Sequence, residues 1–289
     1  AAYLNVHLAG SLMLLDHTEV YNSLLLFAPD GNMWRYDKNY PWGWERGYFR
    51  PGYGPGYGPG YGPEYGITVA ETDLGRIGMM ICWDVGHLDL WRRYAGLIDL
   101  MLISSCPPDI SNPTYHFPNG DQVTMDQMGP LVAPLKNTGR LVFGDMINEQ
   151  TAWLGIPAVN TVGCGHIETG IPNGLGSLLS MVPAAPWLIK YLPQARRLRL
   201  SCDFVPGCKV VEASGRVLSE LRQDEGEAFT LAEVTLADHR PQPKGPQPRS
   251  RLSSLTYLTS DLILPLLSIP TYRRGLRRAW GKHMAPVEA

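Results

Sequence analysis

The stretch GRIGMMICWD, residues 75–84, decides the fold class of this chain. Its first seven residues form an apolar run of the kind that fills a buried β-strand. Residues 88–97 then place apolar side chains at helical spacing, and residues 100–104 (LMLIS) are apolar again. Strand, helix and strand in succession predict an α/β fold.

Other strands are predicted on both sides of this unit. Residues 5–11 and 21–28 read as two strands around a polar turn at residues 16–19. Further short strands are predicted by apolar or alternating segments, at residues 67–72, 141–146, 158–162, 208–211, 215–218 and 229–236. The mixture indicates an α/β sandwich.

Length and charge divide the chain into a body and a tail. The 289 residues are 44% hydrophobic and 18% charged, which is typical of a globular protein with a substantial core. The net charge is -2, which gives no reason to expect nucleic acid as a partner. Residues 240–289 carry nine Lys and Arg against two acids, a net of +7, so residues 1–239 carry -2 - 7 = -9. We expect one domain over 1–239 and a basic tail over 240–289.

The tail combines a linker, an apolar stretch and an arginine cluster. Residues 241–248 (PQPKGPQP) predict a stiff linker, and residues 262–269 (LILPLLSI) are apolar but far shorter than a membrane span. We expect that stretch to be covered, because soluble proteins seldom leave such a surface open. The acidic body of a neighbouring subunit is favoured over an anionic membrane, since Pro265 and Pro270 interrupt the apolar half.

A short tandem repeat lies between the predicted strands at residues 21–28 and 67–72. The tetrapeptide PGYG begins at residues 51, 55 and 59, and PEYG at 63–66 is a degenerate copy. Glycine and proline this dense exclude a helix or a central strand, so a surface loop is predicted. Its tyrosines form either an aromatic binding ribbon or merely an expanded, tolerated loop.

The cysteines and the first residues indicate the compartment. Five cysteines at irregular spacing, with no CxxC pair, argue against a disulfide scaffold and against a structural metal. The chain opens without a basic segment followed by a long apolar stretch, so no signal peptide is predicted. We expect a cytoplasmic protein without a metal.

Two residues are candidates for nucleophilic chemistry. Cys82 follows a buried strand and precedes a helix, a turn at which α/β folds hold nucleophiles, although most free cysteines are buried and inert. A thiolate also needs a cation or base nearby. Lys38, in WRYDKNYP at residues 34–41, follows a strand and precedes a loop rich in Trp and Tyr, which makes it either that cation or a solvated lysine.

Taken together, these segments resemble the nitrilase superfamily of carbon–nitrogen hydrolases. The resemblance rests on HLAGS (7–11), YNSLLLFAPDG (21–31), YDKNYP (36–41) with Glu45, and GRIGMMICWD (75–84). Downstream, PAVNTVG (157–163), residues 176–177 and CKVVEASGRVL (208–218) follow in the family's order, so the resemblance spans residues 5 to about 237. It implies a four-layer αββα sandwich that forms a homo-oligomer, a dimer or a larger and possibly helical assembly, with no cofactor.

The resemblance also implies catalytic roles. Cys82 would attack the substrate carbon and form a thioester, while Lys38 and the backbone N–H of Trp83 stabilise the charge that develops on the substrate heteroatom. Glu45 either matches the second glutamate of many members, which orients groups and relays protons, or is an exposed loop carboxylate. Lys38 would also depress the pKa of Cys82 and make it the thiol most reactive toward iodoacetamide.

The principal base glutamate of the family is not found at its expected place. It normally lies farther upstream of the lysine than the 37 residues that precede Lys38, and the only glutamate there, Glu19, sits in a predicted turn. Glu19 is not given the role. We expect that a preceding segment of the full-length protein carries the base.

The substrate class is weakly marked in the sequence. The triplet Cys82-Trp-Asp84 lies between nitrilase and amidase patterns, and residues 41–45 (PWGWE) look more like the loop of an aliphatic amidase. A linear amide or carbamoyl compound is therefore the expected substrate, with a nitrile second. An inactive oligomerising protein and a redox thiol pair with Cys106 are the other interpretations. Four tryptophans, at positions 42, 44, 83 and 153, either wall an apolar pocket or belong to the ordinary hydrophobic core.

Overall fold

The structure is a computed structural model that describes residues 1–52 and 66–279. Most of the PGYG repeat, at residues 53–65, lies outside the described residues, and so does the end of the tail at 280–289. The interpretation of the repeat as a surface loop therefore stays a prediction.

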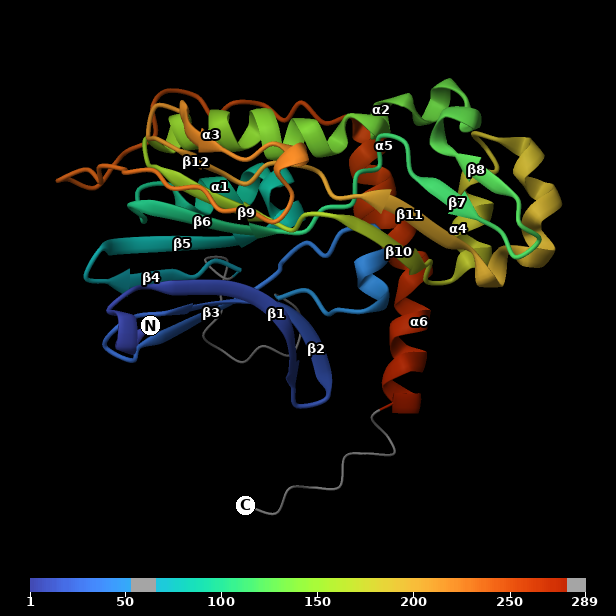
Figure 1. Cartoon of the computed structure of the whole chain (residues 1–289), viewed down its shortest axis with the longest axis horizontal. Helices are drawn as coiled ribbons and strands as arrows, with labels where there is room; N and C mark the ends of the chain where they lie inside the picture. The colour runs from blue at the N-terminus through green and yellow to red at the C-terminus, as the bar shows by residue number, and fades with distance from the viewer. Residues whose placement is uncertain (53–65, 280–289) are drawn as a thin grey trace, which may run out of the picture.

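A six-stranded sheet forms the centre of the molecule (Figure 1). Its three middle strands are parallel, namely β5 (Gly75–Ile81), β6 (Leu100–Ser105) and β9 (Ala158–Val162). Its outer strands are antiparallel, namely β4 (Val69–Thr72), β12 (Lys209–Val211) and β13 (Val217–Glu220). The quoted run thus forms a buried strand, and the predicted succession of strand, helix and strand is confirmed.

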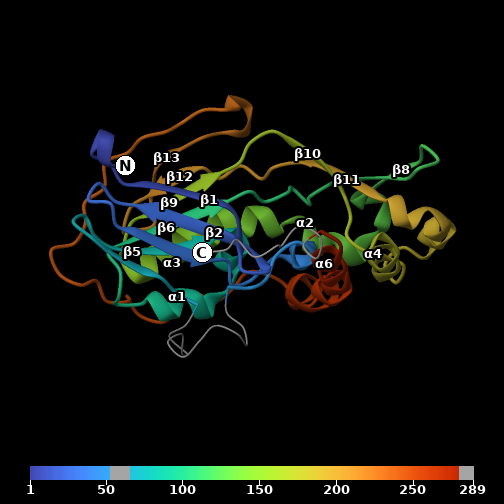
Figure 2. The same ribbon diagram turned by 90° about the horizontal axis from the view of Figure 1, so that it is seen from below.

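Each face of this sheet is covered by a different layer (Figure 2). Helices α1 (Leu88–Tyr94) and α3 (Ile147–Leu154) lie on one face, where Trp91 and Tyr94 are fully buried. The other face packs on a three-stranded antiparallel sheet of β1 (Leu8–Asp16), β2 (Glu19–Phe27) and β3 (Met33–Asp37). The α/β class is confirmed. These elements supply three layers of the expected αββα sandwich, and no α-helix of the described residues lies on the outer face of the three-stranded sheet.

Alternation along β3 directs one lysine between the two sheets. Leu24 of β2 pairs with Tyr36 of β3, and both are buried against the six-stranded sheet. Because side chains alternate along a strand, the residue two positions after Tyr36 points to the same side. That residue is Lys38.

A second core lies beside the first. It is built on a four-stranded sheet of β10 (His166–Gly170), β11 (Arg199–Asp203), β7 (Thr114–His116) and β8 (Gln122–Thr124). Helix α4 (Gly174–Met181) and the 3-10 segment Pro186–Arg197 pack on it, and the short helix α2 (Ala133–Lys136) lies nearby. The two cores meet at Trp42, which packs against both.

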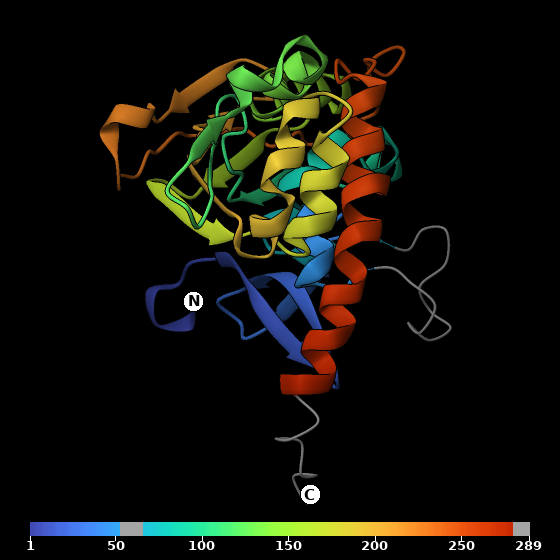
Figure 3. The same cartoon turned by 90° about the vertical axis from the view of Figure 1, so that its right-hand side faces the viewer.

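The tail packs along the body of its own chain (Figure 3). Helix α5 (Ser254–Tyr257), a π-helical segment (Leu258–Ile263) and α6 (Leu264–Ala279) follow one another beside the 3-10 helix η2 (Gly43–Gly47). Leu264 and Tyr272 are buried there, while Leu262 and Leu266 stay more than half exposed. The body thus covers one side of the predicted apolar stretch.

The tail differs from the sequence expectation in two local features. The helix continues through Pro270, whereas the sequence predicted an interruption there. The linker is tied down as well, because the Trp153 indole donates to the carbonyl of Gly245 and the Lys244 amide donates back to Trp153. Within the described residues, no helix has the length and apolar character needed to cross a membrane.

Two predicted strands are wrong. Arg140–Met146 is π-helical, and its buried residues Val142, Phe143 and Met146 are spaced as one helical face. A short apolar run does not distinguish strand from helix, which explains this error. Residues 229–236 form no strand, and Phe229 and Leu231 are about four-fifths exposed, because their alternation meets no partner strand.

Candidate active site

Cys82 occupies a sharp turn at the carboxyl end of β5. Its φ angle is +52°, a left-handed conformation that is unusual for a residue with a side chain. It is the first residue of the 3-10 helix η3 (Cys82–Gly86), and only 8% of it is exposed. The turn therefore fixes the thiol rigidly at the sheet edge, as the sequence predicted.

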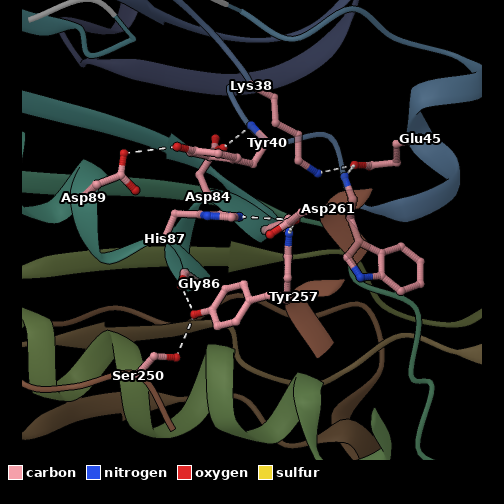
Figure 4. A network of polar contacts seen from close by, with 12 residues as sticks. Lys38, Tyr40, Glu45, Asp84, Gly86, His87, Asp89, Ser250, Tyr257 and Asp261 are labelled. Atoms are coloured by element: carbon pink, nitrogen blue, oxygen red, sulfur yellow. Dashed lines mark hydrogen bonds and ion pairs between the residues drawn. The ribbon is translucent and has the colours of Figure 1, made fainter. Parts of the chain in front are cut away.

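Lys38 reaches the same region from the other sheet. Its side chain is fully buried, and its Nζ lies 2.5 Å from Oε2 of Glu45. The same carboxylate oxygen accepts the backbone N–H of Trp42 at 2.6 Å, which fixes Glu45 on η2 (Figure 4). The interpretation of Lys38 as a solvated lysine is thus excluded.

These residues surround one small cavity. Its volume is about 40 Å³, and its walls include Glu45, Cys82, Trp83 and Cys106. Lys38 adjoins it through its contact with Glu45. A larger hollow of about 690 Å³ lies elsewhere, between residues 162–166 and 221–229, and none of the three predicted catalytic side chains lines it. Choosing the larger hollow as the candidate site would therefore have placed it away from Cys82, Lys38 and Glu45.

Burial determines the resting state of the Cys82 thiol. Burial raises its pKa to about 11, although Lys38 and a hydrogen bond from the backbone of Cys106 both lower it. The expectation that Lys38 gives this cysteine a depressed pKa is therefore wrong, because the desolvation of the thiolate outweighs the nearby cation. A thiol with this pKa is protonated at neutral pH, so it becomes a thiolate only when a base takes its proton.

We expect the alkylation of Cys82 to depend steeply on pH. Because only the thiolate reacts, the rate should rise about tenfold per pH unit from about pH 7 to pH 10. Peptide mapping after brief exposure to iodoacetamide measures this rate, with the exposed Cys164 as an internal control that should label first at pH 7. A Cys82 rate that levels off below about pH 8 would contradict the protonated resting state.

Lys38 stays charged in this site. Burial lowers its pKa, but a thiolate at Cys82, once it forms, and the carboxylates of Glu45 and Asp84 raise it above its ordinary value. An ammonium held in a dry site is a strong electrostatic partner for charge that develops on a bound substrate.

Asp84 is a buried carboxylate that links the segments that carry Lys38 and Cys82. It accepts hydrogen bonds from the Tyr36 hydroxyl at 2.8 Å and from the backbone N–H groups of Tyr40 and Ile81, at 2.8 and 3.1 Å. Burial raises its pKa, while Lys38 and these donors oppose that shift. Asp84 thus joins the loop after β3 to the turn that holds Cys82. The motif at residues 75–84 contains Asp84 but does not predict this structural role.

The C-terminal segment also contacts the site. The indole N–H of Trp83 donates to Oδ1 of Asp261 at 2.7 Å, and Nε2 of His87 lies 3.6 Å from the same oxygen. The Tyr40 ring stacks on His87 with 3.5 Å between centroids. Sequence reasoning missed Asp261, because nothing local marks a contact between positions 83 and 261.

Three other residues named in the sequence analysis differ in their distance from the cavity of Cys82, namely Glu19, Cys106 and Trp153. Glu19 contacts Arg50 and Tyr272 rather than the cavity, which agrees with its being given no catalytic role. Cys106 lines the same cavity as Cys82, and both are free thiols. Trp153 packs on the linker instead of the site. Among the residues in 1–52 and 66–279, no cluster of His, Cys, Asp and Glu is arranged to hold a metal ion.

Comparison with known proteins agrees with the sequence resemblance. Residues 1–120 match the family model described as carbon-nitrogen hydrolase, and this part contains Lys38, Glu45 and Cys82. The resemblance to that family is thereby confirmed over residues 1–120. A search of curated proteins found no match.

Solved structures that are similar to this chain include an amidase and a CN-hydrolase superfamily protein. An amidase from Nesterenkonia sp. is 17% identical, with a TM-score of 0.45 over 77% of this chain and 59% of that one. XC1258 from Xanthomonas campestris, a CN-hydrolase superfamily protein with an arsenic adduct in its active site, is 16% identical, with a TM-score of 0.45 over 77% and 61%. The chain thus spans about three-fifths of the length of these proteins.

Proposed function

We propose that this protein hydrolyses a non-peptide carbon–nitrogen bond of a linear amide or carbamoyl compound and releases ammonia. One observation carries the proposal: Cys82, on its left-handed turn, shares a small cavity with Glu45, which holds the buried ammonium of Lys38 at 2.5 Å. A nucleophile, a fixed cation and a carboxylate at one point suit acyl transfer.

The first half of the reaction forms a thioester. The sulfur of Cys82 bonds to the carbonyl carbon, and the negative charge that develops on the carbonyl oxygen is stabilised by Lys38 and the backbone N–H of Trp83. The carbon–nitrogen bond then breaks, and the thiol proton leaves with the amine as ammonia. Because the thiol rests protonated, a principal carboxylate base has to take that proton, and we propose that Glu45 in the cavity wall acts beside it as the second, relaying glutamate.

The second half regenerates the enzyme. Water attacks the thioester carbon, the carbon–sulfur bond breaks, and the proton of the water returns to the sulfur. The products are the carboxylic acid and a free thiol. No redox partner is needed in this scheme, since no atom changes oxidation state.

A comparison of amides with nitriles tests the proposal. We expect ammonia release from hexanamide to exceed release from hexanenitrile at least tenfold, and the Cys82→Ala variant to release none above background. Ammonia is measured in a coupled assay with the full chain. Faster release from the nitrile would assign the protein to nitrile hydrolysis, and no release from either compound would contradict the proposal.

A further inference from the structure

A second cavity adjoins the reactive one. Its volume is about 330 Å³, and it lies where η2, the four-stranded sheet region and the C-terminal helices meet. Trp42 and Ile110 line both cavities, so the two spaces share a wall. The sequence expectation of an apolar pocket behind tryptophans is met here by Trp42 and Trp44.

The lining of this cavity is apolar. None of the described residues that line it carries a charged side chain. Its polar groups include Ser180, whose hydroxyl donates to the carbonyl of Ser177 at 2.7 Å, and Trp44, whose indole N–H donates to the Ser177 hydroxyl at 2.9 Å. Because both donors bond to Ser177, which does not line the cavity, Ser180 and Trp44 present mainly carbon atoms to the cavity.

The walls also contain adaptable elements. Met125, Met128 and Met181 contribute flexible thioethers that adjust to irregular apolar groups. The π-helical segment Leu258–Ile263 supplies part of the wall, and such wide turns recur at functional sites. An apolar group of variable shape fits this lining better than a rigid polar one.

The reactive cavity cannot hold a whole substrate. A cavity needs roughly 10–15 Å³ to hold one water molecule, so a volume of about 40 Å³ admits only the few atoms of a carboxamide. The rest of the substrate has to lie elsewhere, and the adjoining apolar cavity is the neighbouring space. An apolar cavity of about 150 Å³ binds benzene, so one twice as large takes an apolar group of about twelve carbons.

We propose that this second cavity receives an apolar acyl group of the substrate, which passes between Trp42 and Ile110 from the thiol of Cys82. The inference rests on the proposed amide hydrolysis and narrows its substrate to medium-chain, uncharged amides. Short polar amides gain no binding free energy from the cavity, because they have no apolar group to bury there. Acyl chains with a terminal charge are disfavoured, because no lining residue supplies a counter-ion.

Binding of straight-chain amides to the Cys82→Ala variant tests this without chemistry. From butanamide to octanamide, the dissociation constant in a ligand-observed NMR titration should fall by about threefold to fourfold per added methylene. Ala184→Phe, which fills the cavity from a half-buried wall position, should reduce the preference for octanamide over butanamide at least tenfold. Met181→Trp serves as a second variant should the first fail to fold.

The matched control is Ala213→Phe, at a half-buried turn position that lines neither cavity, and it should leave the preference unchanged. Equal affinity for butanamide and octanamide would overturn the inference, and so would cavity variants that keep the full preference of their parent for octanamide. Ammonia release by the unmodified chain is measured in parallel. Chain-length-dependent binding without ammonia would contradict the hydrolase proposal instead, and ammonia release without chain-length dependence would contradict the cavity assignment alone.

Discussion

Replacing Cys82 by alanine is expected to lower ammonia release from amides by at least about a thousandfold while the fold is retained. The Cys82 thiol lies in the cavity wall beside Glu45, the partner of Lys38, and its attack yields a covalent acyl intermediate. Alanine occupies the same left-handed turn at a similar conformational cost, so the melting temperature should change little. Steady-state ammonia release and thermal unfolding measure the two effects.

The control for this variant is Cys202→Ala. Cys202 is also a buried free cysteine, but it lies in β11 and lines neither the reactive nor the apolar cavity. Its replacement should leave the activity within about twofold of the parent. Loss of activity in both variants to the same degree would point to a folding defect, and activity retained in Cys82→Ala would remove Cys82 from the mechanism.

Replacing Glu45 by glutamine is expected to affect stability as well as activity. The variant leaves the ammonium of Lys38 buried without its nearest carboxylate, which costs about 3 kcal/mol in the free energy of unfolding. For a chain of 289 residues that corresponds to a fall in melting temperature of about 5 °C. Ammonia release should drop at least a hundredfold, because the proton relay and the position of Lys38 are both lost.

Two further variants separate the ion pair's structural effect from its chemical effect. The double variant Lys38→Met with Glu45→Leu removes both charges, so its melting temperature should recover toward the parent while its activity stays lost. Glu212→Gln breaks an exposed ion pair with Arg216 and should leave both quantities nearly unchanged. A Glu45→Gln chain as stable as the parent would show that Lys38 does not depend on this partner.

The site's dependence on the tail follows from the same contacts. Asp261 lies in the π-helical segment of the tail and accepts the indole N–H of Trp83, the residue that follows Cys82. The hydroxyl of Tyr257 donates to the carbonyl of Gly86, at the end of the same 3-10 helix. The residues 254–263 thus help to hold the turn that presents the thiol.

The sequence predicts the parts of the fold that depend on local pattern. The apolar run at residues 75–81 identifies a buried strand. The motif that surrounds Cys82 identifies the turn. These features require no knowledge of distant contacts.

Features that depend on tertiary contacts escape sequence reasoning. The pKa of Cys82 results from burial between two sheets, which the motif does not encode. The helical Arg140–Met146 has an apolar run too short for its periodicity to decide. Asp261 reaches Trp83 only because the tail folds back along η2.

The most direct test of the account is the mass of a trapped intermediate. The full chain is mixed with hexanamide, quenched in acid within seconds, digested and examined by mass spectrometry. We predict a hexanoyl group, as a thioester, on the peptide that contains Cys82, absent from the Cys82→Ala variant and removed by hydroxylamine. A hexanoyl group on Cys106 or Lys38, or ammonia release with no acylated peptide at any quench time, would contradict the assignment of Cys82 as the nucleophile.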